Sequence, residues 1–125
     1  MGSDYKGNKP NRLGVKYAVN GIVYAFRSEM NMKVHFVVLF IVLFCGYALG
    51  VSATEWMLLT LTIGAVLICE LFNTAMEHLL DYLAPEIHPT VGKIKDLTAG
   101  AVLVAAFTSI IIGLIIFLPK FLLIL

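Results

Sequence analysis

The chain has 125 residues, of which 60% are hydrophobic and 14% are charged. A soluble domain has about 45–50% apolar and about 25% charged residues, and a globule of this size is mostly surface, so it cannot hide the excess. The composition excludes an ordinary soluble domain, and the net charge of +1 gives no reason to expect a nucleic-acid partner.

The chain opens with a short segment, residues 1–14, which we expect to be a disordered or tag-derived arm. From residue 15 to residue 29, apolar side chains alternate with lysine, asparagine, arginine and glutamate. This mixed pattern is typical of an amphipathic helix that lies in the membrane interface. We therefore predict an interfacial helix at the start of a membrane-embedded domain that covers residues 15–125.

Three apolar segments follow, at residues 34–51, 56–80 and 97–118. Each is close to the ~20 residues that a helix needs to cross the hydrocarbon core of a bilayer. Each must be helical, because lipid offers no partners to unpaired backbone groups. The predicted fold is an all-α integral membrane protein with three transmembrane helices, joined by connectors at residues 52–55 and 81–96.

Basic residues are concentrated before the first apolar segment. They are Lys6, Lys9, Arg12, Lys16, Arg27 and Lys33, against Asp4 and Glu29. Positive charge marks the cytoplasmic side of a membrane protein. We therefore expect the amino terminus and the second connector in the cytoplasm. Lys120, near the carboxyl end, is the one basic residue that opposes this orientation.

The second apolar segment carries four polar residues on one helical face. With about 100° per residue and Glu70 at zero, Asn73 lies near about −60°, Glu77 near about −20° and Asp81 near about +20°. We call these four residues the polar stripe. At about 1.5 Å per residue it extends over roughly 16 Å, with Glu70 deepest and Asp81 at the cytoplasmic edge.

A charge at the centre of a span costs at least ~2.5 kcal/mol, so ionisable residues there indicate a functional site. The alternative is that the polar stripe only hydrogen-bonds neighbouring helices. If it is functional, Glu70 suits a general base. Glu77, nearer water, suits Mg²⁺, which takes one or two carboxylates and leaves other positions for phosphate. Glu29 is a candidate second carboxylate, and Lys95 a candidate phosphate binder. The alternatives are a solvated residue at a helix end for Glu29 and a topology anchor for the pair of Lys95 and Asp96.

Two other classes of function remain open from these residues. One is a small proton-coupled transporter in which Glu70 is the protonation switch. That reading leaves Glu29, Glu77 and Lys95 without a role. The other is a structural membrane subunit without chemistry, which the polar stripe argues against. Conventional nucleotide motifs such as GxxxxGK[ST] and GxGxxG are missing, so any ATP chemistry must use another scaffold.

Two further sequence patterns are more specific. The run ELFNTAMEHLLD at residues 70–81, followed by KDLTAGAV at residues 95–102, closely resembles the prokaryotic diacylglycerol kinase family, which includes the undecaprenol kinases. Upstream, AFRSEMNMKVH at residues 25–35 looks like the undecaprenol kinase branch. The resemblance covers roughly residues 17–118.

The resemblance implies a homotrimer in a bacterial cell (inner) membrane, with active sites shared between subunits at the cytoplasmic face. It implies transfer of the γ-phosphate of MgATP to the primary hydroxyl of a membrane lipid, undecaprenol or else diacylglycerol. Glu70 matches the catalytic base, with Asn73 orienting it. Glu29 and Glu77 match the carboxylates that hold the metal beside ATP. Residues matching nucleotide contacts or other polar positions of the site are Tyr17, Asp81, Glu86, His88, Lys95 and Asp96.

Overall fold

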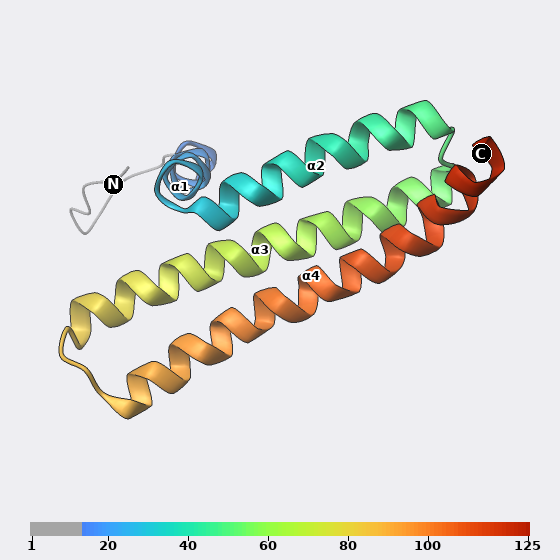
Figure 1. The fold of residues 1–125 in the computed structure, drawn as a ribbon. Helices are drawn as coiled ribbons and strands as arrows, with labels where there is room; N and C mark the ends of the chain where they lie inside the picture. The colour runs from blue at the N-terminus through green and yellow to red at the C-terminus, as the bar shows by residue number, and fades with distance from the viewer. Residues whose placement is uncertain (1–13) are drawn as a thin grey trace.

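The computed structural model describes residues 14–125, which form four helices. They are α1 (Val15–Ser28), α2 (Met30–Leu49), α3 (Ala53–Leu83) and α4 (Pro89–Ile124). Figure 1 shows α2, α3 and α4 as long helices running alongside one another, with α1 lying across the end of the bundle at the start of α2. This part of the chain contains no strand, so the all-α class is confirmed. The arm predicted at residues 1–14 falls, apart from Gly14, outside the described residues.

Three of the helices, α2, α3 and α4, are long and apolar enough to cross a membrane. They correspond to the three predicted segments. Large apolar side chains are exposed along them, including Phe40, Phe44, Phe72 and Phe107. Such exposure fits a chain whose outer surface meets lipid or other apolar surfaces rather than water.

The first connector is shorter than predicted because α3 begins three residues before residue 56. Ser52 Oγ accepts a hydrogen bond from the Glu55 N–H at 3.2 Å, and the Glu55 carboxylate accepts one from the Ser52 N–H at 3.0 Å. This reciprocal capping satisfies two backbone donors that would otherwise lack a partner, and it starts the helix at Ala53. Gly50 ends α2 with a φ of 69°, a conformation that favours glycine.

The second connector was predicted too long. Only residues 84–88 are non-helical, and α4 begins at Pro89, eight residues before residue 97. The His88 ring accepts a hydrogen bond from the Thr90 N–H at 3.1 Å, and proline suits the first helical position. Lys95 and Asp96 therefore lie on a helix and not in a loop. Apolar patterning marks where lipid ends, whereas capping groups mark where the helix ends.

At the end of the bundle where α2 joins α3, a small core forms from Val51, Leu59 and Ile116. Nearby, Lys120 on α4 forms an ion pair with Glu55 on α3 at 3.0 Å. Lys120 was the basic residue that opposed the predicted orientation. Its charge is balanced locally by the Glu55 carboxylate.

Candidate active site

The polar stripe lies on the buried face of α3. The buried residues of this helix include Leu59, Val66, Glu70, Asn73 and Thr74, which share one side of it. Glu70 is 1% exposed, Glu77 is half-buried and Asp81 is exposed. Burial therefore decreases from Glu70 to Asp81, and the most buried residues of the stripe face the interior of the bundle.

Glu70 is buried without a full set of partners. Its Oε2 atom forms no hydrogen bond. The nearest basic group is the His35 ring on α2, whose Nε2 lies 3.7 Å from Oε2. The charges of Glu29 and Glu77 also act on this carboxyl. A buried acceptor without a hydrogen bond is costly and rare in native structures, so the contact with His35 leaves this oxygen incompletely satisfied.

Asn73 does link two helices. Its Oδ1 accepts a hydrogen bond from the Thr98 hydroxyl on α4 at 2.8 Å, and its Nδ2 lies 3.5 Å from Glu77 Oε1. The alternative role for the stripe, hydrogen bonding between helices, therefore holds for Asn73. These contacts direct its side chain toward Glu77, whereas the family resemblance implied that it orients Glu70.

Asp81 and Lys95 join α3 to α4 at the outer end of the polar stripe. Lys95 Nζ donates to Asp81 Oδ1 at 2.6 Å. The Asp81 side chain is 67% exposed and the Lys95 side chain 37%, and such an exposed pair contributes little to stability, about 0–1 kcal/mol. Its effect is to hold an ammonium group where the stripe meets water.

Glu29 lies at the break between α1 and α2. Its backbone is extended, with φ −115° and ψ 121°, and it is half-buried. Helix α1 is tied to α3 by Tyr24, whose hydroxyl lies 2.6 Å from His78 Nε2. His78 Nδ1 in turn lies 2.9 Å from the Thr74 carbonyl oxygen. This docking of α1 places Glu29 within electrostatic reach of Glu70.

The remaining predicted site residues are more dispersed. Tyr17 is half-buried on α1, and His88 caps α4. Glu86 in the second connector and Asp96 on α4 are exposed. Within residues 14–125, Glu86 and Asp96 form no hydrogen bond or ion pair with the polar stripe. The fold thus brings together the stripe, Glu29 and Lys95, and leaves Glu86 and Asp96 at its edge.

Three acidic residues of the site, Glu29, Glu70 and Glu77, carry like charges that a bound cation would offset. Among residues 14–125, none of the three is paired with a lysine or arginine. No group of three or more His, Cys, Asp or Glu side chains in this part of the chain could hold a metal ion unaided. Two carboxylates that leave positions for water and phosphate are the arrangement that Mg²⁺ accepts.

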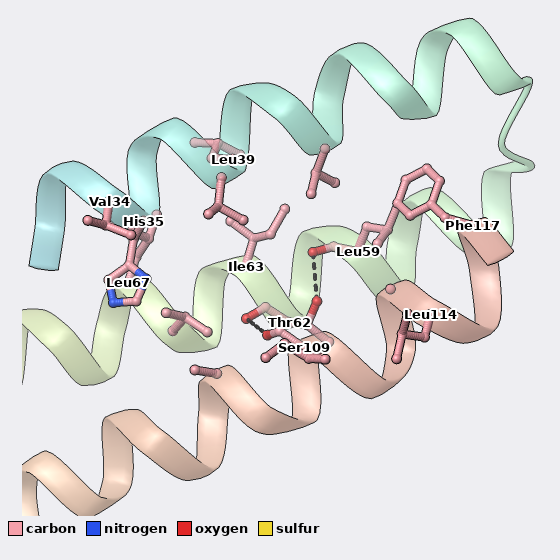
Figure 2. Close-up of a pocket in the computed structure, with 16 residues that line it drawn as sticks. Val34, His35, Leu39, Leu59, Thr62, Ile63, Leu67, Ser109, Leu114 and Phe117 are labelled. Atoms are coloured by element: carbon pink, nitrogen blue, oxygen red, sulfur yellow. Dashed lines mark hydrogen bonds between the residues drawn. The ribbon is translucent and has the colours of Figure 1, made fainter. Parts of the chain in front are cut away.

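An apolar cavity of about 480 Å³ lies between α2, α3 and α4. Its polar lining side chains are His35, Thr62 and Ser109. The Thr62 and Ser109 hydroxyls donate to backbone carbonyl oxygens, at 3.1 Å to Leu59 and at 3.0 Å to Ala105. Figure 2 shows His35 at one end of the cavity and Phe117 at the other. The cavity therefore offers apolar walls and one polar end, beside Glu70.

Two residues of this site were missed by the sequence reasoning. Thr98 follows Lys95 by three positions, so one helical turn separates them, and that spacing was the available signal. His35 is the last residue of the AFRSEMNMKVH run, but no role was predicted for it. Its neighbour Glu70 is 35 positions away, and only the packing of α2 on α3 brings the two together.

Comparison with known proteins identifies the family of this chain. Residues 16–117 match the family described as prokaryotic diacylglycerol kinase. The chain belongs to this family. It is 44% identical over 122 residues to an undecaprenol kinase of Bacillus subtilis (strain 168), with 96% of this chain and 99% of that protein covered.

Other relatives from the family are diacylglycerol kinases. The protein from Synechocystis sp. is 36% identical over 115 residues, covering 90% of this chain and 66% of the relative. The protein from Escherichia coli (strain K12) is 28% identical over 95 residues, covering 76% and 78%. Membership of the prokaryotic diacylglycerol kinase family makes this chain a membrane lipid kinase, and the transporter alternative finds no support among these relatives.

Proposed function

We propose that this lipid kinase transfers the γ-phosphate of MgATP directly to the primary hydroxyl of undecaprenol, or else of diacylglycerol. The observation that carries the proposal is the burial of Glu70. Its carboxylate is 1% exposed, has an unpaired oxygen, and lies beside the polar end of an apolar cavity. A lipid alcohol combines a hydrocarbon chain with one hydroxyl, and this site combines the two matching features.

In this proposal Glu70 accepts the proton of the lipid hydroxyl as the oxygen attacks phosphorus. A general base must come within hydrogen-bond reach of the proton it removes. The unpaired Oε2 has no competing donor at hydrogen-bond distance, so it is free to accept that proton. Phosphoryl transfer needs little covalent help from the protein, so positioning and charge supply most of the rate.

Glu29 and Glu77 are the proposed metal-holding residues. Both are partly buried, and neither is paired with a basic side chain within residues 14–125. When bound there, Mg²⁺ would offset charge on the phosphates of ATP. We assign Asn73 to the alignment of Glu77, since its amide lies 3.5 Å from that carboxylate.

The nucleotide would lie at the outer end of the polar stripe. Lys95, held by Asp81 at 2.6 Å, provides a compact positive charge for phosphate. The family resemblance adds Tyr17, Glu86, His88 and Asp96 as nucleotide contacts. Of these, Tyr17 lies on α1 and Glu86 and His88 in or beside the second connector, which Figure 1 places at the same end of the bundle.

The lipid chain would enter the cavity between α2, α3 and α4 with its hydroxyl at the His35 end. We place undecaprenol ahead of diacylglycerol for two reasons. The relative named undecaprenol kinase is 44% identical, against 36% and 28% for two named diacylglycerol kinases. The AFRSEMNMKVH run at residues 25–35 also matches the undecaprenol kinase branch.

We further propose that the protein is a homotrimer with shared active sites in a bacterial cell membrane, with its amino terminus and active site facing the cytoplasm. The apolar residues of α1 support an interfacial position. Val15, Val19, Ile22 and Phe26 are exposed at spacings that place them on one side of the helix. The concentration of basic residues before the first span supports the orientation.

The test compares the two lipids in one assay. Purified protein in mixed micelles receives Mg²⁺, ATP labelled at the γ-phosphate, and either undecaprenol or diacylglycerol. We expect label in extracted lipid that depends on Mg²⁺, with undecaprenol the better acceptor. Absence of label from both lipids would contradict the proposed function, whereas preference for diacylglycerol would reverse the order of substrates only.

A further inference from the structure

His35 belongs to two features at once. Its ring lines the polar end of the apolar cavity, and its Nε2 lies 3.7 Å from Glu70 Oε2. No other residue that lines this cavity carries an ionisable side chain. In Figure 2 the ring points from α2 toward α3, beside Leu67. His35 therefore stands between the place proposed for the lipid hydroxyl and the carboxylate proposed to take its proton.

The proposed reaction leaves a proton on a buried group. When the lipid oxygen bonds to phosphorus and the bond from phosphorus to the ADP oxygen breaks, the hydroxyl proton moves to Glu70. That carboxyl is 1% exposed, so water cannot collect the proton from it directly. The His35 ring lies beside this carboxyl, with Nε2 3.7 Å from Oε2. An imidazole exchanges protons readily near neutral pH, so His35 is the group placed to take the proton from Glu70.

We propose that His35 is a positioning residue that returns Glu70 to its working state by relaying the proton. Neutral Nε2 accepts the proton from Glu70 Oε2, which restores the carboxylate, and the imidazolium then gives the proton to water. This inference rests on the proposed function, because it needs Glu70 to be the base. The 3.7 Å gap exceeds hydrogen-bond length by about 0.5 Å, which a small side-chain rotation or one bridging water closes.

The charged surroundings of the pair are acidic. Glu29, between α1 and α2, and Glu77, on α3, both act on the Glu70 carboxyl. From α4, the residues that line the cavity are all uncharged, and Lys95 is engaged by Asp81. Among residues 14–125, no lysine or arginine is paired with Glu70 or His35.

The relay is tested with three variants of the full-length protein in micelles with undecaprenol and MgATP. His35→Ala removes the ring, and His35→Gln keeps a hydrogen-bonding side chain that cannot carry the proton. Val38→Ala, one helical turn away on the same cavity wall, is the matched control for lost packing. Each is assayed with and without added imidazole, and size-exclusion chromatography confirms that the oligomer matches the unsubstituted protein.

We expect His35→Ala and His35→Gln to lower kcat roughly tenfold or more, with KM for ATP within about twofold. Imidazole should restore His35→Ala, in proportion to its free-base concentration as pH rises, because only the neutral form accepts a proton. Added imidazole should not change the rate of Val38→Ala. Rates of His35→Gln close to the unsubstituted protein, or a loss in His35→Ala that imidazole never restores, would overturn the relay. An unsubstituted protein that phosphorylates neither undecaprenol nor diacylglycerol would instead contradict the proposed function.

Discussion

Helix α3 carries two glutamates, the partly buried Glu55 and the buried Glu70, whose carboxylates differ in the partners they have. Glu55, in the first turn, accepts from the Ser52 N–H and pairs with Lys120 at 3.0 Å. Glu70, four turns later, is 1% exposed and has an oxygen without a hydrogen bond. One carboxylate has all the partners that a structural role requires. The other is left available, and that difference marks the end of the molecule where chemistry is proposed.

The contrast between Glu55 and Glu70 is tested most strongly by Glu70→Gln. This change keeps the shape of the side chain and removes its ability to accept a proton. We expect turnover to fall by about 10²–10⁴-fold, while the protein still elutes as the same oligomer in detergent. The measurement is transfer of labelled phosphate to lipid. A variant with normal turnover would remove Glu70 from the role of base.

Glu77→Gln tests whether a second stripe residue belongs to the same chemistry. With one of two metal-holding carboxylates lost, we expect turnover to fall roughly 100-fold and the half-saturating Mg²⁺ concentration to rise. Titration of activity against Mg²⁺ measures both. If activity and Mg²⁺ dependence stayed normal, the metal assignment would be wrong even if Glu70 proved essential.

Thr98→Val examines the support around these carboxylates. The change leaves Asn73 Oδ1 without its donor from α4, at a cost of about 1–3 kcal/mol in stability. Turnover should fall severalfold, because Asn73 would no longer be held beside Glu77. Thr108→Val is the matched control, since that exposed hydroxyl donates only to the Val104 carbonyl of its own helix. Equal effects from the two variants would show that Asn73 needs no such support.

Glu55→Gln should have the smallest effect on catalysis. It weakens the pair with Lys120 and the cap of α3, so thermal unfolding in detergent should begin at a lower temperature. Turnover should stay within about twofold of the unsubstituted protein, as expected for a residue far from the reacting groups. A large loss of turnover in the folded variant would erase the contrast between the two glutamates.

Several features of this molecule were predictable from local patterns. The three spans follow from runs of apolar residues, and the placement of the polar stripe on one face follows from helical spacing. Exposure within the chain rises from Glu70 to Asp81, in the same order as their positions along the helix. The prediction that the second connector ends at residue 96 was wrong, since α4 includes Asp96 and Lys95 and begins at Pro89. A helix continues into water wherever its caps allow.

The sequence by itself determined the membrane class, the polar stripe and, through its motifs, the family. Each depends on residues close together in the chain, and helical geometry relates them without further information. Only the tertiary structure decided that Asn73 bonds Thr98, that Lys120 pairs with Glu55, and that His35 faces Glu70. These pairs are separated by 25, 65 and 35 positions, and packing between helices, which no local period encodes, brings them together.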